Sequence, residues 1–200
     1  MKKKTFIVAV SGGVDSSVLL HKLMKNKPEY VDYIIAHVDH NVRPNSSKDA
    51  EFVEKMALKY NLLVCQTVLK TTKKDEDSLR EKRYEFLFRL KDQYNAESII
   101  TAHHQDDIIE TMIINLIRGT SPRGLSPMNR AGILRPLINS TKAELLQYAK
   151  ENKVLYVEDE TNEDETYLRN YVRKNVMPKL GQSNERLLTI NKTISELYED

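Results

Sequence analysis

Short apolar runs alternate with amphipathic stretches along the first part of the chain. The runs are typical of buried strands, at residues 6–10, 33–38, 62–69 and 98–102. Apolar residues at helical spacing between and after them predict helices at residues 16–25, 47–60, 78–94 and 106–117. Strands that alternate with helices predict an α/β fold, a doubly wound and mainly parallel five-stranded sheet with helices on both faces.

The pattern changes after residue 117. Residues 118–136 contain four Arg, three Gly, three Pro and no acid, which predicts a basic loop. Beyond it we expect further elements, a helix at 141–152, a short strand at 154–157, a helix at 167–176 stopped by Pro178, and an amphipathic helix at 184–198. This last helix has an apolar face with little after it to pack on. We therefore predict one domain at residues 1–180, followed by a separate helix at 181–200.

Composition limits the chemistry more than the overall charge does. The chain has 200 residues, with 31 Lys+Arg against 29 Asp+Glu. This near balance hides the arginine-rich loop and a segment at 158–165 with six acids. One cysteine, Cys65, excludes a disulfide framework and a Cys₄ metal site, and a strand pattern places it in the core. With no apolar stretch of transmembrane length and no complete signal peptide, we expect a cytoplasmic protein that does not enter a membrane.

Three polar motifs follow predicted strand ends, where parallel sheets bind ligands. The first, residues 11–17, reads Ser-Gly-Gly-Val-Asp-Ser-Ser. Two glycines let the backbone turn tightly, while N–H groups, hydroxyls and a helix N-terminus favour an anion such as pyrophosphate. The motif lacks the lysine of a GxxxxGK[ST] loop and is not GxGxxG. The alternative is a plain turn with Asp15 or Ser16 as helix cap.

The other two motifs carry histidines and acids. Residues 103–110 place Asp106 or Asp107 on one helix face with Glu110, a carboxylate pair that suits an ammonium group or a metal. His103 and His104 beside them could contact phosphate, transfer a proton or bind a cation. The alternative is a capping Asp in a solvated acidic first turn. At residues 37–43 we expect contact with adenine, ribose or phosphate, with a half-buried His37 and a solvated Arg43 as the alternative.

Arginines supply the candidate nucleic-acid surface. The acid-free loop at 118–136 creates a local positive field that suits a phosphate backbone, although a flexible surface loop is the alternative. Arg80 and Arg83, next to Tyr84, could contact RNA or pair with neighbouring glutamates.

Residues 11–16 resemble the signature of the PP-loop, or N-type, ATP pyrophosphatases. The resemblance implies an adenine nucleotide alpha hydrolase-like fold and cleavage of ATP between its α and β phosphates. It also implies that Asp15 helps to position Mg²⁺ or a group on the phosphate side. The implied ATP-binding residues are Ser11, Gly12, Gly13, Asp15, Ser16, Ser17 and His37.

Further motifs resemble the tRNA(Ile)-lysidine synthetase family over about residues 6–180. They lie, in order, at residues 36–43, 79–84, 101–111, 118–128, 135–137, 159–162 and 169–178. The resemblance implies a carbon–nitrogen ligase that adenylates C2 of the wobble cytidine in tRNA(Ile) with a CAU anticodon. The amino group of L-lysine then displaces AMP. A homodimer is left open.

The resemblance also implies residue roles. Asp15, His103, Asp107 and Glu110 would be catalytic. Lysine would be bound by Asp107, Glu110, Arg169 and Arg173, and tRNA by Arg80, Arg83, Arg118, Arg123 and Arg135. Two departures stand out. Ser121-Pro122 replaces a second glycine of the family's arginine loop, and the family usually carries a tRNA-binding part beyond residue 200. The resemblance therefore implies a catalytic domain at residues 1–180 and, at 181–200, a helix that begins a linker to a tRNA-binding domain. We interpret the chain as an N-terminal catalytic domain or a minimal enzyme.

Other functions remain open alternatives. A PP-loop enzyme that inserts sulfur into tRNA usually depends on paired cysteines or an iron–sulfur cluster, which one cysteine argues against. An amidating ligase of the NAD or GMP synthetase type gives no reason for the arginine loop. A nucleotide-binding module without activity gives no reason for intact carboxylates beside an intact glycine loop.

Overall fold

The structure, a computed structural model, describes residues 3–39, 46–69, 76–125, 128, 130–158, 168–181 and 183–197. The chain forms two compact units. The sheet unit comprises Met1–Ala102, Gly132–Pro136 and Ala143–Glu158. The helical unit comprises His103–Ala131, Leu137–Lys142 and Asp159–Asp200. The chain thus leaves the sheet unit after Ala102 and returns to it twice, at Gly132–Pro136 and at Ala143–Glu158.

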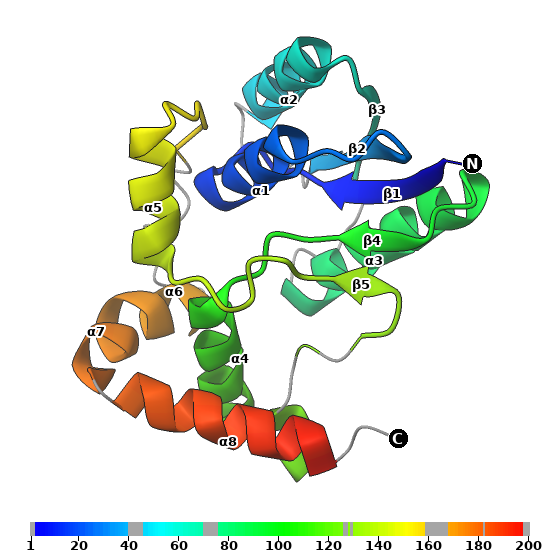
Figure 1. The fold of residues 1–200 in the computed structure, drawn as a ribbon. Coiled ribbons are helices and arrows are strands. Elements are labelled where there is room, and N and C mark those ends of the chain that lie inside the picture. The colour runs from blue at the N-terminus through cyan, green and yellow to red at the C-terminus, as the bar shows by residue number, and fades with distance from the viewer. Residues whose placement is uncertain are drawn as a thin grey trace. The chain divides into compact units, whose positions relative to one another are not determined.

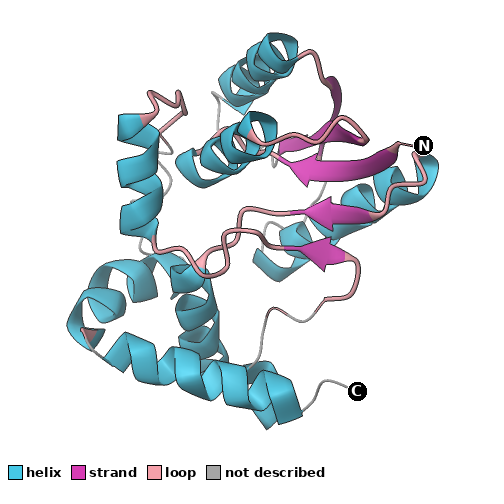
Figure 2. Ribbon diagram, viewed as in Figure 1, coloured by secondary structure: helices cyan, strands magenta, loops and turns pink. Residues whose placement is uncertain are grey.

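The sheet has the strand order β3-β2-β1-β4-β5, and every pair of neighbours is parallel. Figures 1 and 2 show β1, β4 and β5 side by side and pointing the same way. The strands are β1 (Lys4–Ala9), β2 (Val31–Asp39), β3 (Leu63–Val68), β4 (Ser98–Ile100) and β5 (Ile133–Leu134). The parallel α/β fold predicted from the sequence is confirmed. Because the strands are parallel, the glycine loop after β1 and the end of β2 lie at the same end of the sheet, beyond the carboxyl ends of the strands.

The prediction of the fifth strand was wrong. Residues 154–158 form no strand; Val157 donates a single backbone hydrogen bond to the Gly12 carbonyl. The fifth strand is instead β5, two residues that pair with β4 inside the segment predicted to be a basic loop. A strand this short shows no alternation of apolar and polar residues, and the surrounding Gly, Pro and Arg suggested a loop. That segment also contains a 3₁₀ turn, η1 (Pro122–Leu125).

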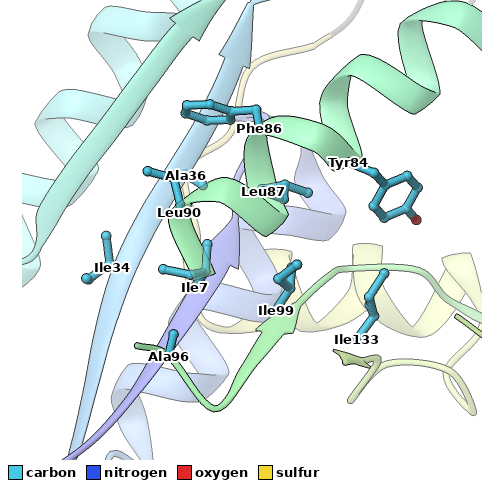
Figure 3. Close-up of a cluster of buried hydrophobic side chains, with 10 residues drawn as sticks. All are labelled: Ile7, Ile34, Ala36, Tyr84, Phe86, Leu87, Leu90, Ala96, Ile99 and Ile133. Carbon is cyan, nitrogen blue, oxygen red and sulfur yellow. The ribbon is translucent and has the colours of Figure 1, made fainter. Parts of the chain in front are cut away.

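Helix α3 (Glu76–Gln93) covers one face of the sheet. Its Leu87 and Leu90 pack with strand residues such as Ile7 and Ile99 in a buried cluster (Figure 3). The whole cluster comprises Ile7, Ile34, Ala36, Tyr84, Phe86, Leu87, Leu90, Ala96, Ile99 and Ile133. Cys65 is half-buried and packs against this cluster, close to its predicted core position.

Residues of the opposite pleat, Val8 and Ile35, are fully buried too. Helices α1 (Val14–Lys25) and α2 (Ser46–Tyr60) lie on this other side of the sheet (Figure 1), so both faces are covered as predicted. Helix α5 (Lys142–Glu151) lies beside α1, where the Tyr148 hydroxyl is 3.0 Å from His21 Nδ1. Burial and the nearby charges of Lys25 and Lys59 lower the pKa of His21.

The helical unit is built around α4 (Gln105–Arg118). It also contains α6 (Leu168–Tyr171), a π-helical turn η3 (Val172–Val176), α7 (Met177–Leu180) and α8 (Ser183–Leu197). Pro178 does not end the helical segment as predicted. It stands in the first turn of α7, where a missing N–H costs little.

Helix α8 packs against α4 and η1, and Asn191 Nδ2 donates to the Leu125 carbonyl at 2.9 Å. Its apolar face, predicted to lack a partner, is therefore partly covered, although Ile190 and Leu197 stay exposed. No helix among the described residues is both long and apolar enough to cross a membrane.

Candidate functional site

Serine hydroxyls accept backbone hydrogen bonds within the glycine loop between β1 and α1. Ser16 Oγ accepts hydrogen bonds from the backbone N–H groups of Ser11 and Gly12, each at 3.2 Å, and donates to the Gly13 carbonyl at 3.0 Å. The Ser11 hydroxyl accepts the N–H of Gly13 at 3.3 Å. Three successive N–H groups therefore converge on hydroxyl oxygens. An anion that replaces the hydroxyl oxygens would meet the same N–H donors, and the N-terminus of α1 adds partial positive charge.

Gly12 has φ +97°, a backbone conformation that residues with a Cβ rarely adopt. Gly13, the N-cap of α1, has φ −69° and ψ 167°, which any residue can adopt. We expect Gly12→Ala to lower the free energy of unfolding by about 1–3 kcal/mol through backbone strain. Gly13→Ala is the matched control, because its added Cβ would meet Ser11 Oγ at an ordinary 3.6 Å. Urea denaturation of both variants checks this, and equal costs would contradict it.

His37, predicted to bind ATP, is buried in β2 with 2% of its surface exposed. Its Nδ1 lies 2.9 Å from the Val10 carbonyl, which makes Nδ1 the protonated nitrogen and leaves Nε2 as an acceptor. Nε2 has no hydrogen-bond partner among the described residues. The imidazole is more buried than either sequence interpretation expected. Asp15 is half-buried in the first turn of α1.

The predicted lysine-binding residues come together in the helical unit around a buried carboxylate. Glu110 is only 1% exposed. Arg173 binds it in a fork, with Nε 2.7 Å from Oε1 and Nη2 2.8 Å from Oε2. Arg169 Nη1 lies 3.7 Å from Oε2, and Arg173 also lies 3.8 Å from Asp107 Oδ1. Two carboxylates and two guanidinium groups therefore form one ion cluster, which we call the Glu110 cluster.

The first turn of α4 supports this cluster through its caps. The N-cap residue His104 donates its backbone N–H to Asp107 Oδ2 at 2.9 Å. Its buried ring lies between Asp106 and Asp107, at 3.4 and 3.6 Å from their carboxylate oxygens. The alternative of an N-capping Asp in a solvated turn is wrong, because His104 is the N-cap; Asp107 caps the helix from its third position and also contacts Arg173. His103, one residue earlier, is half-buried.

Asp106 links α4 to the start of α5. Its Oδ2 accepts the backbone N–H of Lys142 at 2.6 Å. The His104 ring, whose Nδ1 lies 3.4 Å from Asp106 Oδ2, and then that N–H lower the pKa of Asp106, and burial opposes them.

A carboxyl group with a lowered pKa stabilises the fold above its ordinary value of about 4 and loses that contribution as the pH falls through the folded value. We therefore expect Asp106→Asn to cost about 1 kcal/mol at pH 5 and clearly less at pH 3. Urea denaturation of wild type and variant at both pH values measures the difference. A cost independent of pH would show that the charge of Asp106 contributes nothing.

Sequence reasoning gave Thr111 no role. Its hydroxyl donates to the Asp107 carbonyl at 2.7 Å and lies 3.5 Å from Arg169 Nη1. Thr111 therefore helps to orient Arg169 beside Glu110. The available signal was its position next to Glu110 and four residues after Asp107.

The predicted tRNA-binding arginines lie on several different elements of the chain. Arg80 and Arg83 lie over the ring of buried Tyr84, at 6.0 and 5.3 Å. Arg118 is exposed at the end of α4, whereas Arg135 is half-buried with Nη1 3.4 Å from the Ile133 carbonyl. Predictions for His40, Arg43, residues 159–165 and the side chain of Arg123 lie outside the described residues. Gly124 has a structural role, because a Cβ there would collide with Thr120 Oγ1.

A nucleotide-type glycine loop at the end of β1, on an all-parallel sheet, defines a class of ATP-binding proteins. The chain belongs to the PP-loop family, since the ATP_bind_3 model, described as a PP-loop domain, matches residues 1–180.

Among curated proteins it is similar to tRNA(Ile)-lysidine synthases. It is 39% identical to that of Thermotoga sp. (strain RQ2) over 89% of this chain and 45% of the relative. It is 38% identical to that of Bacillus subtilis (strain 168) over 100% of this chain and 46% of the relative. The chain thus spans less than half the length of these relatives.

Solved structures support the fold. The U34-tRNA thiolase NcsA from Methanococcus maripaludis, solved with its [4Fe-4S] cluster, superposes with a TM-score of 0.82 at 15% identity. That match covers 98% of this chain and 73% of the thiolase. An NH3-dependent NAD synthetase from Campylobacter jejuni gives 0.54 at 14% identity, over 98% of this chain and 88% of the synthetase. At these identities the likeness is evidence of a shared fold, and the adenine nucleotide alpha hydrolase-like prediction is confirmed.

Proposed function

We propose that this chain is the catalytic part of a tRNA(Ile)-lysidine synthase, an ATP-dependent carbon–nitrogen ligase. The single observation that carries the proposal is the Glu110 cluster, in which a buried carboxylate and Asp107 contact cationic groups. A site that binds guanidinium groups in this way has the charge and burial needed for the ammonium group of lysine. The names of the curated relatives support the same reaction.

In the first step, the C2 oxygen of the wobble cytidine attacks the α-phosphorus of ATP and pyrophosphate leaves. The N–H groups of the glycine loop would hold the phosphates, while His37 Nε2 would accept a hydrogen bond from the nucleotide. Mg²⁺ usually binds through one or two carboxylates plus substrate phosphates, and Asp15 in the first turn of α1 fits as such a ligand. Bound there, Mg²⁺ would neutralise charge on the leaving pyrophosphate.

In the second step, the amino group of L-lysine attacks C2 and AMP leaves. Asp107 and Glu110 would hold the ammonium group, and His103 or a carboxylate would accept the proton that the amine must lose. Arg169 and Arg173 would contact the lysine carboxylate or the adenylate. The tRNA(Ile) with its CAU anticodon would meet Arg80, Arg83, Arg118, Arg123 and Arg135, and such a substrate implies the cytoplasm.

The boundaries of the catalytic domain belong to the same proposal. We propose residues 1–180 as the catalytic domain and residues 181–200, which include α8, as the start of a link to a tRNA-binding part. The family match over residues 1–180 supports the first boundary. A homodimer stays a prediction, which a measurement of the molecular mass in solution can check.

Two other functions are less well supported. Sulfur insertion into tRNA fits the fold of the thiolase neighbour, but iron–sulfur clusters are normally held by several cysteines, and this chain has Cys65 alone. Amidation of a small molecule fits the fold of the NAD synthetase neighbour. It gives no reason for a carboxylate cluster suited to an alkylammonium group.

The test is an assay with radiolabelled ATP, Mg²⁺, L-lysine and unmodified tRNA(Ile). We expect pyrophosphate to form when tRNA is present, and AMP to form only when both lysine and tRNA are present. The control adds, as a separate chain, the C-terminal part of the Bacillus subtilis relative, because this chain spans 46% of that protein. No release of AMP with lysine in either assay would refute the proposal for this chain.

A further inference from the structure

The carboxylates proposed to bind lysine are already in contact with a cation of the protein itself. Arg173 contacts both of them, through two short hydrogen bonds to Glu110 and a 3.8 Å approach to Asp107. The fork geometry matches a guanidinium to a carboxylate, so Glu110 is well neutralised as the structure stands. An incoming ammonium group therefore cannot add to this site without replacing something.

Burial differs between the two partners. The side chain of Glu110 is 2% exposed, whereas that of Arg173 is 39% exposed. A guanidinium that is partly in water can move away at low cost, but a carboxylate this deeply buried cannot be left without a cation. Arg173 is therefore the partner that can leave, provided that another cation takes its place.

The segment that carries Arg173 allows such movement. It belongs to the π-helical turn η3, between two helices of four residues each. Val172 anchors this turn because it is fully buried, while the neighbouring Arg173 reaches the surface. π-helical turns are rare and are often found at functional sites.

We propose that Arg173 is an exchangeable occupant of the amine site and determines its specificity. A substrate ammonium group replaces the guanidinium at Glu110 and Asp107, and Arg173 turns towards solvent or a bound anion. The inference rests on the proposed function and goes further, because it states what the substrate must displace.

Exchange makes the site selective for charge. An alkylammonium ion restores the short contacts and the charge that Glu110 loses with Arg173, whereas a neutral nucleophile such as an alcohol or an amide would leave the buried carboxylate with Arg169 alone, at 3.7 Å. It also weakens apparent affinity, because only molecules with Arg173 displaced are competent to bind. Removing the guanidinium should therefore tighten the binding of a simple alkylamine.

The test uses n-butylamine, which has the ammonium group of lysine but no carboxylate for Arg173 to bind. Binding is followed by NMR on the whole chain, through the Arg173 Nε–H resonance, assigned by its loss in Arg173→Lys. In the wild type we expect butylammonium to shift or broaden this resonance and n-butanol at equal concentration to leave it unchanged.

Arg173→Gln should bind butylammonium roughly tenfold more tightly than the wild type does. Lys174→Gln, an equal charge change at the next and exposed residue, should bind as wild type does.

Three results would overturn the proposal. They are butylammonium binding that leaves the Arg173 resonance unchanged, equal or weaker binding by Arg173→Gln, and no binding by the wild type at all. The wild-type resonance distinguishes exchange from its absence even if Arg173→Gln fails to fold. If butylammonium displaces Arg173 as expected but the ligase assay fails, the proposed function is wrong. If the ligase assay succeeds but butylammonium does not displace Arg173, the exchange is wrong.

Discussion

Glu110→Ala is expected to lower the free energy of unfolding by about 3 kcal/mol, the largest effect on stability that we predict for a single side chain. The variant loses two hydrogen bonds to Arg173 and leaves two guanidinium groups close together without their shared carboxylate. It also leaves a cavity in a nearly inaccessible place. The partial exposure of both arginines keeps the expected value at the low end for a broken buried ion pair.

Urea denaturation near pH 7 measures this cost, and the same unit supplies a control. Glu196 lies 3.9 Å from Lys192 on α8, with both side chains more than half exposed. Glu196→Ala should change stability by less than about 0.5 kcal/mol. If both variants cost the same, the Glu110 cluster does not stabilise the fold. A double-mutant cycle with Arg173→Ala then gives the coupling energy between the two residues.

Asp15 and Asp107 are expected to separate the two halves of the proposed reaction. Asp15→Ala should lower the rate of AMP formation by about 10²- to 10³-fold, because charge on the leaving pyrophosphate loses its metal. Its KM for lysine should stay close to that of the wild type. Asp107→Asn removes a charge from the amine site and should mainly raise the KM for lysine.

The choice of asparagine at position 107 follows from the helix cap. Asp107 accepts the backbone N–H of His104, so alanine would also cost about 1 kcal/mol of helix stability. Asparagine keeps an oxygen acceptor and changes only the charge. The measurement is AMP release at varied ATP and varied lysine. If both variants raise only the ATP requirement, the assignment of roles is wrong.

The strands of the sheet that are long and apolar were predictable. Runs of apolar residues predict β1, β2 and β3, and the helices between them predict that these strands run parallel. β5 was not predictable, because its two residues are defined by pairing with β4, which is a property of the folded sheet and leaves no local pattern. The same holds for η3, a π-helical turn inside a segment whose pattern predicted one continuous helix.

For the candidate site, residue identities were predictable and their contacts were not. Spacing placed either Asp106 or Asp107 on one helix face with Glu110, and in the structure Asp107 and Glu110 contact the same arginine, Arg173. The pairing of Glu110 with Arg173 joins positions 63 residues apart. The helical pattern around either residue does not indicate which cation pairs with the buried carboxylate.

The path of the chain through the two units has a consequence for folding during synthesis. β5 and most of α5 belong to the sheet unit, yet they are made only after the stretch from His103 to Ala131. In a nascent chain that ends near Ala102, β4 is therefore an edge strand without β5 beside it, and α1 lacks its contact with Tyr148. The first part of the chain cannot complete its core until about residue 158 has left the ribosome. Until then it is expected to resist proteases poorly and to depend on chaperones.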